Sequence, residues 1–359
     1  MSIAKEAMKE RIRDWKIKYG EGVYALIFGG RGCEREVSVE SARCALSVLW
    51  DRLPLIPIYI DAEGGFYAVS SAFDDQPPDL SLASVFAVSP VICCGVGCLD
   101  IGGELIPIRR ALPLLHGDFG EDGRIQGLLD SLNIPFVGAD TVCGAVSSDK
   151  AYTKAVAASI GIPVLPYRTL GEGESSGRAR ELAGELGYPV FIKPCRLGSS
   201  IGAYCADCEE ELLPLIEKSR EAAGRIMLEP MLRHKRELEC AYLSVGDKRI
   251  ITPPGEAVTG NRFYDFEAKY KSSLTRIFPR AEVPRELAER LRIYTDRLAE
   301  ELCVRDIARF DYFLSEDGQL YFNEVNTMPG MTEGSLYPMM LDASGVDLPS
   351  LLTLLLRGG

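Results

Sequence analysis

The sequence has 359 residues, which is enough for two or three domains with buried cores. Its apolar content of 47% and charged content of 26% are those of an ordinary soluble protein. The net charge of −12 argues against a nucleic-acid backbone as a partner, although a nucleotide needs only a local basic cleft.

Residues 1–20 are charged and predict a short helix, so no export is expected. The apolar run Val85–Leu99 contains Pro90 and is too short to span a bilayer, so it predicts a buried strand pair and no membrane partner. The 11 cysteines have scattered spacing, which is typical of reduced thiols and predicts a cytoplasmic location. Cys205 and Cys208 form one CxxC pair, either a redox or zinc site or, as we favour, a coincidence.

The first third begins with a strand–turn–helix–strand pattern. An apolar strand, Val23–Phe28, runs into a glycine-rich turn at 29–32, and the helix Glu36–Trp50 and the strand Leu55–Ile60 follow. This pattern predicts a βαβ unit, whose loops at the carboxyl ends of the strands are where α/β folds bind ligands. The turn lacks GxGxxG, so it binds something other than a dinucleotide or is simply a tight turn.

A second glycine-rich loop follows the predicted strand Ala111–Leu115. Its three glycines within seven positions, in HGDFGEDG, let backbone N–H groups approach a ligand closely. Asp122 is expected to cap a helix that starts near Arg124. His116, at the end of the strand, is either a ligand contact or a hydrogen-bonded structural histidine.

The central part carries two lysines on separate elements. Lys150 opens a predicted helix that ends at Ile160, and Lys193 lies on the predicted strand Pro189–Pro194. A loop rich in glycine and serine, Cys195–Gly202, comes next. No P-loop motif occurs, so these features predict a different kind of phosphate cradle.

The last part contains a long polar stretch, Gly255–Thr275, which predicts a functional lid because such long connections are unusual inside compact domains. The amphipathic segment Pro284–Cys303 predicts a packing helix. The other predicted elements are the strands Arg225–Leu228, Glu239–Val245 and Arg249–Thr252 and a final helix, Leu348–Leu356.

Near the carboxyl end, a strand at Leu320–Val325 and an upstream strand containing Asp311 are joined by a turn at 315–318. Glu324 and Asn326 are two residues apart, so on an extended strand they point to the same face. Folded as a hairpin, the two strands bring three hard oxygen donors together. Such a set suits Mg²⁺, although two solvated acids on an exposed sheet would give the same pattern.

The stretch FNEVNTMPGMTEGSLYP resembles the metal-binding strand and substrate loop of D-alanine–D-alanine ligases, which are ATP-grasp enzymes. The strings CEREVSVESA, HGxxGEDGxxQG and FYDFEAKY resemble further motifs of this family, in the family's order. The resemblance covers nearly the whole chain from Val23 onward. It implies an α/β (α+β ATP-grasp) fold, with a Rossmann-like parallel-sheet substrate domain at 1–138 and two ATP-grasp subdomains at 139–232 and 233–359.

The resemblance implies ATP-dependent ligation of two D-alanines through a D-alanyl phosphate, for peptidoglycan precursor synthesis. It implies two Mg²⁺ (or Mn²⁺) ions and a homodimer. A D-alanine–D-serine or D-alanine–D-lactate ligase of the same family is one alternative. A nucleotide-binding regulator that has lost catalysis is another.

The resemblance also implies contacts with the nucleotide. Lys150 and Lys193 would neutralise the α- and β-phosphates, and Lys269 would reach the γ-phosphate. Glu229 would meet the adenine amino group, and Glu237 the ribose hydroxyls. The loop over the triphosphate would consist of Gly198, Ser199 and Ser200.

Contacts with the amino-acid substrates follow in the same way. Glu34 would meet the ammonium of the first D-alanine, with His116 beside it. Arg309 and the N–H of Gly330 would stabilise the tetrahedral oxyanion, and Ser335 would take the carboxylate of the second D-alanine. The remaining implied residues are Tyr270, closing the lid through Ser199 and Glu34; Leu336, facing the methyl of the second D-alanine; and the metal ligands Asp311, Glu324 and Asn326.

Overall fold

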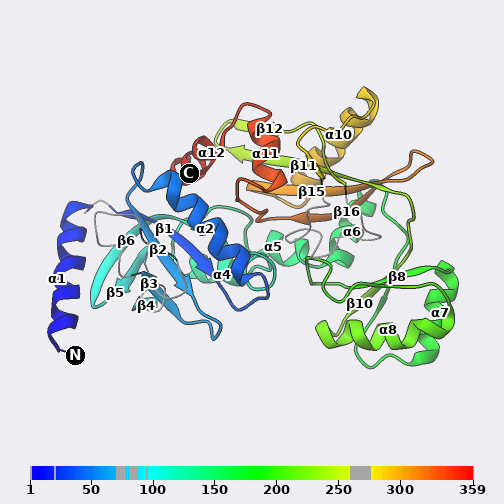
Figure 1. Ribbon diagram of the computed structural model, residues 1–359, viewed down its shortest axis with the longest axis horizontal. Helices are drawn as coiled ribbons and strands as arrows, with labels where there is room; N and C mark the ends of the chain where they lie inside the picture. Colours follow the sequence, from blue (N-terminus) through cyan, green and yellow to red (C-terminus); the bar gives the residue numbers. More distant parts are fainter. Residues whose placement is uncertain are drawn as a thin grey trace.

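The computed structural model describes residues 2–19, 22–69, 78, 80, 88–93, 96–258 and 276–358. In this part of the chain the strands form three sheets, which follow one another along the sequence (Figure 1). The fold is therefore of the mixed α/β kind that the resemblance implied. The domain boundaries at 138 and 232 stay predictions.

The first sheet closes into a barrel of β1 to β6. β1 pairs in parallel with β2 and β6, and α2 packs on β1, which confirms the predicted βαβ unit. β3, β4 and β5 join by antiparallel pairing, so the sheet is mixed, which the pattern of the sequence did not predict. The elements are α1 (Ser2–Lys18), β1 (Val23–Gly29), α2 (Arg35–Leu49), β2 (Leu55–Ile60), β3 (Phe66–Val69), β4 (Val88–Cys93), β5 (Cys98–Ile101) and β6 (Glu104–Pro113).

The glycine-rich loop after β6 leads to three helices that connect the first sheet to the second. The helix after this loop begins at Arg124, as expected, but its N-cap is Gly123 (φ 90°) and not Asp122. Asp122 still accepts a hydrogen bond from the N–H of Arg124 over 3.2 Å. The helices are α4 (Arg124–Ser131), α5 (Thr141–Ser147) and α6 (Lys150–Ser159).

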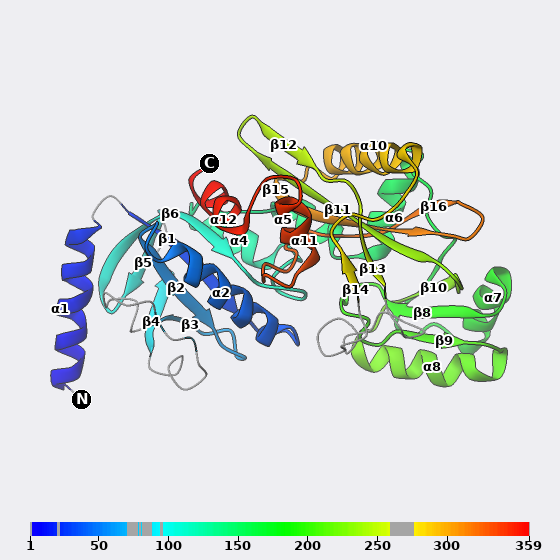
Figure 2. The same ribbon diagram turned by 45° about the horizontal axis from the view of Figure 1, so that its top comes forward.

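The second sheet has the order β7-β10-β8-β9, and α7 and α8 pack on it (Figure 2). Its strand β8 confirms the predicted strand that carries Lys193. The elements are β7 (Arg168–Leu170), α7 (Ser176–Leu186), β8 (Val190–Pro194), β9 (Tyr204–Ala206), α8 (Glu209–Ala222) and β10 (Ile226–Pro230).

The third sheet contains the predicted hairpin, as the antiparallel pair β15–β16. The expected lid starts differently, because Gly255–Val258 is a strand, β13, paired with β11 and β14. The rest of that stretch, residues 259–275 with Lys269 and Tyr270, lies outside the described residues. The elements are β11 (Arg236–Val245), β12 (Lys248–Ile251), β13, β14 (Arg276–Phe278), α10 (Arg285–Glu301), β15 (Asp306–Leu314), β16 (Leu320–Asn326), α11 (Leu336–Asp342) and α12 (Leu348–Arg357).

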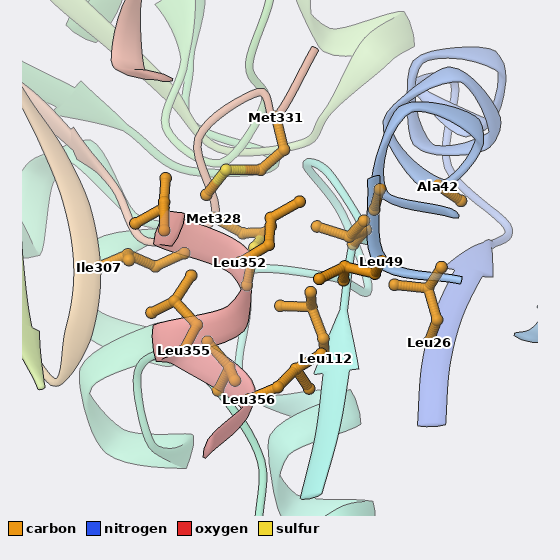
Figure 3. Packing of buried hydrophobic residues seen from close by; sticks show 14 of the residues in the cluster. Leu26, Ala42, Leu49, Leu112, Ile307, Met328, Met331, Leu352, Leu355 and Leu356 are labelled. Atoms are coloured by element: carbon orange, nitrogen blue, oxygen red, sulfur yellow. The ribbon is translucent and has the colours of Figure 1, made fainter. Parts of the chain in front are cut away.

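The C-terminal helix α12 joins the barrel to the third sheet. Its apolar face, with Leu352, Leu355 and Leu356, packs toward Leu49 of α2, Leu112 of β6 and Ile307 of β15 (Figure 3). Burying such side chains contributes about 1.5–3 kcal/mol each. This shared core fixes the barrel beside the hairpin, and the polar residues of interest lie between them.

Candidate active site

The β15–β16 hairpin carries four polar side chains on one face. Backbone pairing sets Arg309 opposite Asn326 and Asp311 opposite Glu324. Alternate residues of a strand share a face, so the four side chains project together. Nδ2 of Asn326 donates to Oδ2 of Asp311 over 3.1 Å. The structure thus brings Asp311, Glu324 and Asn326 together as the sequence predicted.

Arg309 is held between two carboxylates. Its Nε and Nη2 atoms donate to the two carboxylate oxygens of Asp311 over 2.8 and 2.7 Å, and Nε lies 2.8 Å from Oε2 of Glu239. Burial alone would lower the pKa of Arg309, but the charges of Asp311 and Glu239 outweigh it and raise the pKa well above its ordinary value. The guanidinium is therefore a fixed positive charge.

Lys150 links α6 to the hairpin. The side chain of Asp149 caps α6 by accepting two backbone N–H bonds from its first turn, which places Lys150 at the helix start. Nζ of Lys150 lies 3.1 Å from Oε2 of Glu324 and donates to the carbonyl of Leu197 over 2.7 Å. Burial would lower the pKa of Lys150, but the charge of Glu324 raises it.

A second charged group lies deeper, and we call it the Lys–Glu–Lys cluster: Lys154, Glu229 and Lys193. Nζ of Lys154 lies 2.7 Å from Oε1 of Glu229, and Nζ of Lys193 lies 2.7 Å from Oε2. Burial would raise the pKa of Glu229, but the charges of Lys154 and Lys193 outweigh it and hold the pKa at about 2. The carboxylate is therefore ionised despite being buried.

The loop between β8 and β9 reaches across to the barrel. Oγ of Ser199 donates to Oε1 of Glu34 over 2.6 Å, and both residues are buried. Ser199 and Ser200 have positive φ values of 53° and 57°, which cost about 1–3 kcal/mol each and persist only where surrounding contacts impose them. On the barrel side, the loop after β6 needs glycine at position 117 (φ 65°), because a Cβ there would collide with Oε2 of Glu34.

His116 is fixed by hydrogen bonds from both ring nitrogens. Nδ1 lies 3.0 Å from the carbonyl of Met328, so it carries the proton, and Nε2 accepts from Oγ of Ser41 at 2.9 Å. Burial lowers the pKa of His116, which keeps the ring neutral. Nearby, Oε1 of Glu121 accepts from the N–H of Gly117 over 2.9 Å, and burial raises the pKa of Glu121 to about 8.

The loop after β16 places the remaining predicted substrate residues. Gly330 lies so close to Ser335 that a Cβ there would be 2.8 Å from Oγ of Ser335, which also bonds to Oγ1 of Thr332 at 2.8 Å. Leu336 is 6% exposed. A Cβ on Gly255 would lie 3.0 Å from Cδ1 of Leu336, so the backbone of β13 packs closely against the leucine side chain.

Two adjoining cavities collect these residues. The larger, about 480 Å³, lies between the barrel, the hairpin and α11, and the smaller, about 100 Å³, lies between the second and third sheets. Lys150, Ser199 and Glu324 line both cavities, which places them at the junction. The larger cavity is also lined by Glu34, His116, Arg309, Asn326, Gly330, Ser335 and Leu336, and the smaller by Lys193, Ser200, Glu237 and Asp311.

Two family profiles match the chain. One, described as "D-ala D-ala ligase N-terminus", matches residues 23–139, and the other, "D-ala D-ala ligase C-terminus", matches residues 156–357. The chain belongs to the D-alanine–D-alanine ligase family.

Relatives and solved structures agree with this membership. The D-alanine–D-alanine ligase of Deinococcus radiodurans is 37% identical over 92% of this chain and 96% of its own length, and that of Streptomyces griseus is 35% identical over 93% and 91%. D-alanyl-alanine synthetase A from Vibrio cholerae has a TM-score of 0.80 at 29% identity, covering 93% of this chain and 96% of that one. The VanG D-Ala:D-Ser ligase from Enterococcus faecalis has a TM-score of 0.83 at 29% identity, covering 92% and 97%.

This D-alanine–D-alanine ligase family member therefore has the ATP-grasp fold, and ATP use follows from the family. Within the described residues, no helix is long and apolar enough to cross a membrane. Cys205 is half-buried and Cys208 is exposed. In the described part of the chain, no three His, Cys, Asp or Glu side chains are grouped to hold a metal ion.

The hairpin nevertheless offers donors of the right chemistry for a small hard cation. Its set consists of two carboxylates and one amide, from Asp311, Glu324 and Asn326. The ammonium of Lys150 already lies beside Oε2 of Glu324, so a positive charge is accommodated at this carboxylate. Such a set suits Mg²⁺, which binds a few protein oxygen atoms and leaves its other coordination positions to phosphate and water.

Sequence reasoning missed two residues of this ligase family member. Lys154 lies one turn after Lys150, and the i, i+4 spacing on a helix would have placed both lysines on one face. Glu239 lies two residues after Glu237 on β11, and strand alternation would have placed both on one face. Neither pattern identifies the partner, which comes from a different element.

Proposed function

We propose that the chain joins two D-alanine molecules at the expense of ATP, forming D-alanyl-D-alanine for peptidoglycan precursors. The observation that supports this most is the junction of the two cavities. Lys150, Ser199 and Glu324 lie there, between a wall that contains Lys193 and a wall that contains Glu34 and Ser335. A nucleotide and a small amino acid would meet at this junction.

In the first step, a carboxylate oxygen of the first D-alanine attacks the γ-phosphorus of ATP, the bond to the β–γ bridging oxygen breaks, and ADP leaves. Glu34 would accept a hydrogen bond from the substrate ammonium, with Ser199 holding its other oxygen. Because the two reactants are anions, Lys150 and Lys193 would neutralise charge on the phosphates. Divalent cations such as Mg²⁺, held by Asp311, Glu324 and Asn326, would supply further charge neutralisation.

In the second step, the amine of the second D-alanine attacks the acyl-phosphate carbonyl, and inorganic phosphate leaves after the amine loses a proton. Arg309 and the N–H of Gly330 line the larger cavity and would stabilise the oxyanion. Ser335 would bind the carboxylate of the second substrate. His116 would help to shape the site of the first D-alanine through its neutral ring.

The second candidate is a D-alanine–D-serine ligase, because the chain is similar in structure to the VanG D-Ala:D-Ser ligase. Leu336 favours D-alanine, because a leucine gives a serine hydroxyl no hydrogen-bond partner. Burying that hydroxyl would cost about 1–3 kcal/mol, or roughly a tenfold to hundredfold preference.

The test is a panel of amino acids with ATP and Mg²⁺, with ADP release measured and the dipeptides identified by mass spectrometry. We expect D-alanyl-D-alanine as the main product, with slow incorporation of D-serine. Mostly D-alanyl-D-serine from equal D-alanine and D-serine would favour the second candidate. Absence of ADP release on adding D-alanine would favour a regulator without catalysis.

Two properties complete the proposal. We expect a homodimer, as the family resemblance implies, and a mass from analytical ultracentrifugation at the value of one chain would contradict it. We also expect the chain to act in the cytoplasm, where ATP is available, and fractionation of cells would test this.

A further inference from the structure

The Lys–Glu–Lys cluster contains one more lysine than a structural ion pair needs. A single lysine would neutralise Glu229, and the side chain of Lys154, on α6, is fully buried at 2.7 Å from that carboxylate. Lys193 comes from a different element, β8. Met227 pairs with Lys193 and Glu229 with Phe191, so Lys193 and Glu229 are diagonal neighbours on one sheet face. The cluster therefore has an excess of one positive charge.

The excess positive charge faces the smaller cavity through one of the three side chains. Of the three side chains, Lys193 alone lines the smaller cavity, where its Nζ also donates to Oδ1 of Asn323 over 3.3 Å. The side chains of Lys154 and Glu229 are 0% and 2% exposed. An anion in the smaller cavity would therefore contact Lys193 and experience the charge of the whole cluster.

Without Lys154, that charge would vanish. Glu229 would be left with Lys193 as its ion-pair partner in the cluster, and the pair would be neutral. A phosphate would then have to compete with the carboxylate for the same ammonium. The competition would be severe, because a buried carboxylate that loses its partner bears a large desolvation penalty.

We propose that Lys154 is a positioning residue for nucleotide binding: it neutralises Glu229, so that the ammonium of Lys193 remains available to a phosphate. The inference rests on the proposed function in one respect, namely that a nucleoside phosphate occupies the smaller cavity. Lys154 itself would not touch the ligand. Its effect would be exerted through the carboxylate that it shares with Lys193.

The test compares ADP with adenosine as ligands of the full chain, by calorimetry. Lys154→Met keeps a long buried side chain but removes its charge. We expect it to weaken ADP binding by about tenfold to hundredfold, the value of a charge-assisted bond, and to leave adenosine binding unchanged. A purely structural role would lower the melting temperature and weaken both ligands alike, and that result would overturn the proposal.

The double variant Lys154→Met with Glu229→Gln supplies a matched control, because it removes the carboxylate that would otherwise capture Lys193. Compared with Glu229→Gln alone, the double variant should lose much less of the ratio of ADP to adenosine affinity than Lys154→Met loses in the unmodified chain. A tenfold loss of that ratio in this background would mean that Lys154 acts without Glu229, against the proposal. This comparison decides the question even if Lys154→Met alone does not fold.

Failure of the inference can be told from failure of the proposed function. If the unmodified chain releases no ADP from ATP and D-alanine, the proposed function is wrong. If it releases ADP while Lys154→Met keeps the unmodified affinity ratio, only the role of Lys154 is wrong.

Discussion

The hairpin face and the Lys–Glu–Lys cluster are both built from ion pairs between basic side chains and carboxylates, but they differ in the sign of their net charge and in their exposure to the cavities. On the hairpin side, the carboxylates of Asp311, Glu324 and Glu239 outnumber the cations of Arg309 and Lys150. In the Lys–Glu–Lys cluster, two lysines outnumber one carboxylate. The side chain of Glu324 is 19% exposed and lines both cavities, whereas that of Glu229 is 2% exposed and lines neither.

This difference indicates how one cleft can serve ligands of opposite charge. A surplus of accessible carboxylate attracts a cation, and a surplus of ammonium next to the cavity attracts a phosphate. Both surpluses act at short range in a partly desolvated site, where charge pairs interact more strongly than in water. A single substitution is enough to remove either surplus.

The largest effect should come from Glu324→Ala, which removes the carboxylate that is most exposed to both cavities. We expect turnover to fall by about a thousandfold or more, as for loss of a charge-stabilising group in phosphoryl transfer. ADP release at saturating Mg²⁺ is the measurement. A variant with normal ADP release would show that the negative surplus of the hairpin is not needed.

Asn326→Ala should have a smaller effect, because it removes a neutral ligand and the 3.1 Å bond to Asp311 but leaves the charge unchanged. We expect a loss of about tenfold to hundredfold, the range seen when groups supporting a metal site are changed. The rate should be measured across Mg²⁺ concentrations, with Glu324→Ala alongside. A loss equal to that of Glu324→Ala would contradict the importance of charge.

Glu239→Gln tests whether the hairpin surplus matters beyond the predicted ligands. The change leaves Arg309 paired with Asp311 but removes one negative charge 2.8 Å from its Nε. We expect the Mg²⁺ concentration for half-maximal activity to rise by about tenfold or less. If that concentration is unchanged and the rate falls, Glu239 acts through the position of Arg309 instead.

Glu121 is a contrasting carboxylate, partly buried and without a lysine partner among the described residues. Burial raises its pKa from 4.5 to about 8, so the folded chain favours its protonated form. The resulting stability is present below about pH 4.5 and is lost as pH rises through 8. The melting temperature of the unmodified chain should therefore fall between pH 5 and 8, and Glu121→Gln should reduce that fall. Each kcal/mol of unfolding free energy corresponds to about 2–4 °C. Identical pH profiles of the two proteins would exclude this titration.

Local patterns predicted much of this site. Alternation along β15 and β16 was enough to place Asp311, Glu324 and Asn326 on one face, because register in a hairpin follows from the turn. The strand–turn–helix–strand order likewise predicted the parallel pairing of β1 and β2. The apolar run Val85–Leu99 indicated a strand pair, but the antiparallel pairing of β3, β4 and β5 that closes the barrel was not predicted, because short apolar runs do not specify their partners.

The order of the residues is enough to show which side chains carry charge and which of them share a face of a strand or helix, because these elements repeat every 2.0 and 3.6 residues. Which charges meet depends on how the elements pack. Lys154 and Glu229 are 75 residues apart in the numbering and come from α6 and β10. Their pairing depends on how the helix and the second sheet pack, and burial then determines that the resulting charge remains unscreened by water.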